Sequence, residues 1–90
     1  MVKVGIIGLG LIGGSLGLAL QDLKLVKKVL GYDLSSQNAK DALKLGLVDE
    51  IAEFETIKKT CDIIFIAIPV EAIISVLSKL SDIPKSTTII

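Results

Sequence analysis

The chain has 90 residues, of which 51% are hydrophobic, and its ten lysines balance ten acidic residues. A chain of this length forms one small domain, and its apolar runs are too short for a membrane-spanning helix. Nucleic-acid binding needs a basic surface with aromatic platforms, which a neutral chain with three aromatic residues does not offer. With no histidine and one cysteine, we expect no metal site and no disulfide, and a soluble cytoplasmic protein without membrane or nucleic-acid partners.

The first predicted elements are a strand at residues 2–7 and a helix that begins at residue 12. The strand segment is apolar and rich in β-branched residues, and glycine bounds it. After it, apolar residues recur at helical spacing, which predicts an apolar helix face made of Ile12, Leu16, Ala19, Leu20 and Leu23.

A second strand is predicted at residues 26–33, followed by another helix. Ser35 and Ser36 are candidate N-caps of this helix, which is expected to run to about residue 45, where Gly46 supplies the stop. A short third strand near Ile51 and a helical turn at residues 55–59 complete this part of the chain.

The last third of the chain predicts a buried strand, a helix and a further strand. Residues 63–68 form a continuous apolar run, which is typical of a parallel strand covered on both faces. Pro69 can open the next helix, whose inward face is expected to contain Val70, Ile73, Ile74, Leu77 and Leu80. Residues 86–90 are expected to begin a fifth strand.

The alternation of strands and helices predicts an α/β fold of the Rossmann type. Right-handed crossovers between parallel strands place helices on both faces of a doubly wound sheet, for which we expect the strand order 3-2-1-4-5. In such a sheet the ligand crevice lies beyond the carboxyl ends of strands 1 and 4.

A G-x-G-x-x-G motif, Gly8, Gly10 and Gly13, joins the first predicted strand to the first helix. Glycines also serve ordinary tight turns, but this position is typical of dinucleotide binding. Gly8 would permit the turn, Gly10 would let the backbone approach a pyrophosphate, and Gly13 would let the helix pack against the strand. We expect the whole turn, which includes Leu9, to bind the cofactor, with the N–H groups of Leu11 and Ile12 at the phosphates.

Asp33 ends the second predicted strand, twenty residues beyond Gly13. A carboxylate there can accept hydrogen bonds from the adenosine ribose and would repel the 2′-phosphate of NADP, which favours NAD as the cofactor. Leu34 and Ser35 are expected at the same site. The alternative interpretation is an exposed aspartate ahead of a serine helix cap.

A third candidate segment comprises Ala67, Ile68, Pro69 and Val70, at the end of the fourth predicted strand. Pro69 would hold this loop against the cofactor or simply begin a helix, and both roles are compatible. Cys61 has no histidine partner, so we interpret it as a core residue rather than a nucleophile.

Several segments resemble the prephenate dehydrogenase family, the NAD-dependent enzymes of tyrosine biosynthesis. The resemblance extends over almost the whole chain and rests on VGIIGLGLIGGSLGLAL at residues 4–20, GYD at 31–33, LGLVDE at 45–50 and DIIFIAIPVEAIISVL at 62–77. Related reductases of the 6-phosphogluconate and pyrroline-carboxylate kinds share such a domain and remain alternatives. A self-standing module that binds or senses NAD is a further alternative.

The resemblance implies oxidative decarboxylation of prephenate to 4-hydroxyphenylpyruvate, with hydride transfer to NAD. In that family a histidine polarises the substrate hydroxyl and arginines of a helical second domain bind the carboxylates, and this chain has neither residue type. Residues 1–90 are therefore expected to be an N-terminal dinucleotide-binding domain, incomplete at its C-terminus, with no catalytic residues and no helical catalytic domain. The parent enzyme is expected to be a homodimer, and the isolated piece to bind NAD without turning over prephenate and to self-associate through its open sheet edge.

Overall fold

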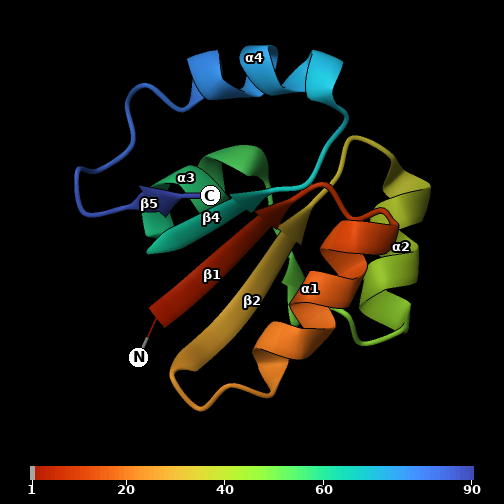
Figure 1. Ribbon diagram of the computed structural model, residues 1–90. Helices are drawn as coiled ribbons and strands as arrows, with labels where there is room; N and C mark the ends of the chain where they lie inside the picture. Colours follow the sequence, from red (N-terminus) through yellow and green to blue (C-terminus); the bar gives the residue numbers. More distant parts are fainter. Residues whose placement is uncertain (1) are drawn as a thin grey trace.

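The computed structural model describes residues 2–90, apart from the side chain of Val70, and shows a parallel five-stranded sheet between helices (Figure 1). Its order is β3-β2-β1-β4-β5, which confirms the predicted doubly wound topology. The elements in chain order are β1 (Val2–Ile7), α1 (Leu11–Gln21), β2 (Val26–Tyr32), α2 (Ser36–Lys44), β3 (Glu50–Ile51), α3 (Phe54–Thr60), β4 (Ile63–Ile66), α4 (Val70–Lys79) and β5 (Thr88–Ile89).

The three central strands end level with one another. Ile7 at the end of β1 is in register with Tyr32 of β2 and with Ile66 of β4. The ladder continues one residue further, because Gly8 N–H donates to the Tyr32 carbonyl and Ala67 N–H donates to the Ile7 carbonyl, each at 2.8 Å. The loops that follow β1, β2 and β4 therefore start at a common edge of the sheet.

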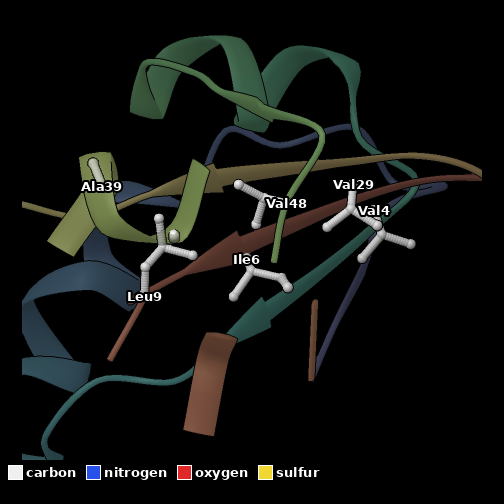
Figure 2. Packing of buried hydrophobic residues seen from close by; sticks show 7 residues of the cluster. Val4, Ile6, Leu9, Val29, Ala39 and Val48 are labelled. Atoms are coloured by element: carbon white, nitrogen blue, oxygen red, sulfur yellow. The ribbon is translucent and has the colours of Figure 1, made fainter. Parts of the chain in front are cut away.

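Two apolar clusters cover the two faces of the sheet, because successive side chains of a strand point to opposite faces. On one face, α1 and α2 pack over a cluster whose labelled members lie between the strands and α2 in Figure 2; its buried residues are Val4, Ile6, Leu9, Val29, Ala39, Ala42 and Val48. On the other face, α3 and α4 cover Ile7, Leu30, Ile57, Cys61, Ile64 and Leu80. Burial raises the pKa of the Cys61 thiol, in agreement with its interpretation as a core residue.

The predicted apolar face of α1 is only partly correct. Leu16 and Leu20 pack against the core, but Ile12 and Leu23 are 77% and 54% exposed, and Ala19 is exposed too. The residues of α1 that the structure buries fully are Gly13, Gly14 and Gly17. Burial of Gly13 agrees with the close packing that its place in the glycine motif predicted, but the apolar periodicity indicated a different inward face, because α1 carries apolar residues around most of its circumference.

The predicted inward face of α4 needs a similar correction. Leu80, the residue that ends this helix, is buried and Val76 packs into the second cluster, whereas Ile74 is 80% and Leu77 46% exposed. The side chain of Val70 lies outside the described part of the structure. Figure 1 shows α4 at the top of the view, toward the carboxyl ends of the central strands.

Three predicted strands are shorter in the structure. The second ends at Tyr32 rather than at Asp33, the fourth at Ile66 rather than at Ile68, and the fifth comprises Thr88–Ile89 alone. The residues removed from the second and fourth strands belong to loops at the carboxyl edge. Within residues 2–90, no helix is long and apolar enough to cross a membrane.

Candidate functional site

The turn after β1 depends on Gly8, whose φ of +102° lies in the region that residues with a side chain rarely adopt. A Cβ at this position would also overlap the carbonyl group of Ala67. The chain can therefore leave β1 close to the loop that follows β4 only because residue 8 is glycine.

The N-terminus of α1 has no side-chain cap. Gly10 is the N-cap residue, and the first turn contains no acidic residue. Gly14 N–H donates to the Gly10 carbonyl at 2.9 Å, so the N–H groups of Leu11 and Ile12 precede the first backbone bond of the helix. These donors and the positive end of the helix dipole make a favourable position for an anion.

Gly10 and Gly13 have different surroundings within this turn. A Cβ at Gly10 would meet no atom within 4 Å, so open space lies in front of the backbone there. A Cβ at Gly13 would overlap the Gly8 carbonyl oxygen, so Gly13 allows α1 to lie directly against the turn. The motif thus combines one glycine that faces open space with one that faces the protein.

Asp33 connects the loop after β2 to the turn after β1. Its Oδ2 accepts hydrogen bonds from Leu9 N–H at 2.7 Å and from Asn38 Nδ2 at 3.4 Å, and its Oδ1 accepts one from Ser35 N–H at 2.8 Å. The Leu9 N–H group is therefore already hydrogen-bonded. Leu9 itself is a core residue and is only 5% exposed. Leu9 shapes the site from beneath, and its side chain does not line it.

Two cavities lie on either side of the glycine turn. The first has a volume of about 300 Å³ and is lined by Ile7, Gly8, Gly10, Tyr32, Asp33, Leu34, Asn38, Ala67, Ile68, Pro69, Ala72 and Val76. The second, more open cavity has a volume of about 690 Å³ and is lined by Gly10, Leu11, Ile12, Leu16, Phe65, Ile66, Ala67, Ile68, Pro69 and Ile90. They share Gly10 and the segment from Ala67 to Pro69, and among the described lining residues Asp33 alone is charged.

The structure brings the three predicted segments together around these cavities, although not every predicted residue lines them. Gly13 packs beneath the turn, and Ser35 caps α2 by accepting from Asn38 N–H at 3.2 Å. The sequence patterns did not indicate a set of wall residues, namely Ile7, Tyr32, Asn38, Leu16, Phe65, Ile66, Ala72, Val76 and Ile90. Asn38 had a local signal, because it lies three residues after the serine cap, whereas the other positions depend on how the elements pack.

A parallel sheet of this order, a glycine turn that leads into a helix after β1, and a carboxylate that follows β2 define a Rossmann-type dinucleotide-binding domain. A family model described as the prephenate dehydrogenase nucleotide-binding domain matches residues 16–90. The chain belongs to this family, as the resemblance of its sequence indicated, rather than to the 6-phosphogluconate or pyrroline-carboxylate reductases.

Individual relatives agree with this assignment. The chain is 41% identical over 75 residues to a prephenate dehydrogenase of Bacillus subtilis (strain 168), which corresponds to 82% of this chain. It is also similar to the crystal structure of Synechocystis arogenate dehydrogenase, with 29% identity, a TM-score of 0.84 and 97% of this chain covered. The crystal structure of prephenate dehydrogenase from Aquifex aeolicus in complex with hydroxyphenyl propionate and NAD+ is similar too, with 28% identity, a TM-score of 0.85 and 99% of this chain covered.

The matched relatives are much longer than this chain. The match covers 20% of the Bacillus subtilis protein, 31% of the Synechocystis chain and 32% of the Aquifex aeolicus chain. The similarity thus concerns the nucleotide-binding part of these dehydrogenases.

Proposed function

We propose that this chain binds NAD as the nucleotide-binding part of a dehydrogenase that oxidises prephenate. The observation that carries the proposal is the pair of cavities that meet at Gly10, with the one charged lining residue, Asp33, in the first. A dinucleotide has two nucleoside halves joined by a pyrophosphate, and this arrangement offers a separate space for each part.

The smaller cavity suits the adenosine half. Its walls are mostly apolar and include Ile68, Pro69 and two residues of α4, Ala72 and Val76, which can contact a flat base. Asp33, the charged residue of this cavity, can accept a hydrogen bond from the ribose. Leu34, 91% exposed at the rim, can cover the base from outside.

The pyrophosphate would lie at the turn between the cavities. Gly10 leaves its space open, and the N–H groups of Leu11 and Ile12 have no acceptor within α1. The nicotinamide half would then extend into the larger cavity, beside Phe65 and Ile90. When bound there, NAD supplies the hydride acceptor, and this chain's residues hold and orient it.

We further propose that these 90 residues bind NAD without turning over prephenate. The chain contains no histidine and no arginine, the residue types that the family is expected to use on the substrate. The relative from Bacillus subtilis supports prephenate as the substrate of the whole enzyme, and the likeness to an arogenate dehydrogenase makes arogenate the second candidate.

The exposed edge of β5 supports pairing with a second copy, which light scattering over a range of concentrations can test.

Calorimetric titration with NAD and NADP tests the proposal directly. We expect the wild-type chain to bind NAD more tightly than NADP, because the Asp33 carboxylate repels a 2′-phosphate. Asp33→Ala should lower NAD affinity by about tenfold or more, since a hydrogen bond to a charged group is lost, and it should reduce the preference for NAD.

Asp41→Ala serves as the matched control, because Asp41 lies on α2 outside both cavities and, among the described residues, its carboxylate bonds Gln37 alone. A wild-type chain that fails to bind NAD at millimolar concentration contradicts the proposed function. Equal affinity for NADP and NAD contradicts only the proposed role of Asp33 and leaves NAD binding itself in place. NADH formation from prephenate by the 90-residue chain would contradict the proposed lack of turnover.

A further inference from the structure

The structure shows that most of the acceptor capacity of Asp33 is already used by the protein. A carboxylate offers about four lone-pair positions, two on each oxygen. Oδ2 accepts from Leu9 N–H at 2.7 Å and from the Asn38 amide at 3.4 Å, and Oδ1 accepts from Ser35 N–H at 2.8 Å. One position, on Oδ1, is left for a ligand.

The ribose of an adenosine presents two neighbouring hydroxyl groups, one more than Asp33 can accept. Asn38 lines the same cavity. The orientation of its side-chain amide is set by the neighbouring Asp33 carboxylate. A carboxylate only accepts hydrogen bonds, so the amide must turn its Nδ2 toward Asp33 Oδ2, which leaves Asn38 Oδ1 as an acceptor without a partner among the described contacts.

The main chain of Asn38 is fixed as well. Its N–H donates to Ser35 Oγ at 3.2 Å in the first turn of α2, and Ser35 N–H donates to Asp33. Asp33, Ser35 and Asn38 thus form one hydrogen-bonded unit at the start of the helix. Ser35 Oγ keeps a second acceptor position, but Ser35 does not line the smaller cavity; the two side-chain acceptors of this unit that face the cavity are therefore Asp33 Oδ1 and Asn38 Oδ1.

We infer that the two hydroxyls of the adenosine ribose are divided between these residues, so that Asp33 Oδ1 accepts one and Asn38 Oδ1 accepts the other. This assignment rests on the proposed binding of NAD. It makes Asn38 a second determinant of ribose recognition, and it departs from a site in which one carboxylate accepts both hydroxyls.

The test compares protein variants with ligands that lack a single hydroxyl. Wild type and Asn38→Leu are titrated by calorimetry with NAD and with the two NAD analogues in which the adenosine ribose lacks its 2′- or its 3′-hydroxyl. Asn38→Leu keeps the approximate shape of the side chain and removes both the oxygen and the NH₂ group of the amide. Asn38→Ala, as a second variant, excludes a new apolar contact of leucine with the base.

We expect both Asn38 variants to bind NAD about tenfold more weakly, the effect of one hydrogen bond in a site of this kind. For one of the two analogues, wild type and variants should bind equally well, because the hydroxyl that Asn38 contacts is missing. For the other analogue, the tenfold difference should persist. Gln37→Leu, which removes an exposed amide one residue away and outside both cavities, should match wild type with every ligand.

Other outcomes overturn the assignment. Unchanged NAD affinity in Asn38→Leu, or the same proportional loss for NAD and both analogues, would show that the amide contacts neither hydroxyl. If the Asn38 variants bind NAD and both analogues with the same affinity, neither hydroxyl contributes to binding any longer, and Asn38 acts only by positioning Asp33. A wild-type chain that does not bind NAD would contradict the proposed function itself, and the assignment with it.

Discussion

Gly10 and Gly13 lie three residues apart in one turn, but the structure gives them opposite environments. The open space at Gly10 belongs to both cavities, whereas the space at Gly13 is filled by the backbone of Gly8. Of these two glycines, Gly13 therefore matters for folding, whereas Gly10 leaves open the space in which we propose the ligand lies. Alanine substitution separates the two roles.

We expect Gly13→Ala to lower the free energy of unfolding by about 1–3 kcal/mol, because its Cβ would overlap the Gly8 carbonyl and push α1 away from the turn. Gly10→Ala should change that free energy by less than about 1 kcal/mol, since its Cβ meets open space. It should nevertheless weaken NAD binding. Urea denaturation and calorimetric titration measure the two effects, and a Gly13→Ala chain as stable as wild type would contradict the close contact.

At the scale of elements, the start of α2 organises one edge of the smaller cavity. Ser35 caps the helix through its Oγ, while its N–H holds Asp33. The local sequence predicted a serine cap here, because serine before a helix is a strong N-terminal signal, and of the two candidates Ser35 and Ser36 the structure selects Ser35. The same cap sets the position of Asn38, so a local preference extends into the site.

Ser35→Ala should destabilise the chain by about 1 kcal/mol, the usual effect of losing a serine N-cap. Ser36→Ala is the matched control, since Ser36 is exposed within the first turn and its hydroxyl makes none of the described hydrogen bonds. Thermal unfolding followed by circular dichroism compares the two variants. Equal stability of Ser35→Ala and wild type would mean that the cap does not stabilise α2.

For the helices α1 and α4, the spacing of apolar residues did not predict correctly which face is buried. In both, apolar residues occupy more than one side of the helix, so spacing alone allows several inward faces. In α1 the glycine face is the buried one, because a Cβ at Gly13 would overlap the Gly8 carbonyl and a Cβ at Gly17 would overlap the Leu47 carbonyl oxygen. In α4, Val76 and Leu80 pack inward and Ile74 and Leu77 do not, which brings Ala72 and Val76 to the smaller cavity.

At the scale of the whole molecule, Lys58 links α3 to the segment between α4 and β5. Its side chain is only 9% exposed, and its Nζ lies 2.8 Å from Asp82 Oδ1 and 3.3 Å from Glu55 Oε1, with the Phe54 ring at 5.9 Å. The hydrogen bond to Asp82 raises the pKa of Lys58, and Lys58 lowers the pKa of Asp82 below its ordinary value of 3.8.

This ion pair predicts a specific pH dependence of stability. Because the folded state lowers the pKa of Asp82, the contribution of the pair is present above pH 3.8 and is lost as the pH falls through the lower, folded value. Asp82→Asn should therefore be less stable than wild type at neutral pH, and the difference should shrink in acid. Denaturation of both chains across the acidic range measures it.

Lys58→Met provides the control for the pH prediction. In that background Asp82→Asn should have no effect at neutral pH, because the partner of the carboxylate is gone. A difference between wild type and Asp82→Asn that stays constant from neutral to acidic pH would contradict the role of the pair.

The sequence by itself determined the alternation of strands and helices from which the strand order was predicted, the glycine turn, a serine cap before the second helix, and the place of Asp33 at the end of the second strand. These follow from local signals, namely apolar runs, glycine spacing and capping residues, which act over a few residues along the chain. The family could be recognised for the same reason. The Asp33 carboxylate was predicted as a ribose acceptor, but its three bonds to Leu9, Ser35 and Asn38 were not.

Only the tertiary structure decided which helix faces are buried, which residues of α4 line the smaller cavity, and how many acceptor positions of Asp33 remain without a protein partner. Those features arise between segments far apart in the chain, as in the bond between Leu9 and Asp33 or the contact of Gly8 with Ala67. Such contacts depend on how closely the layers pack, and packing distance is not encoded in the spacing of any single segment.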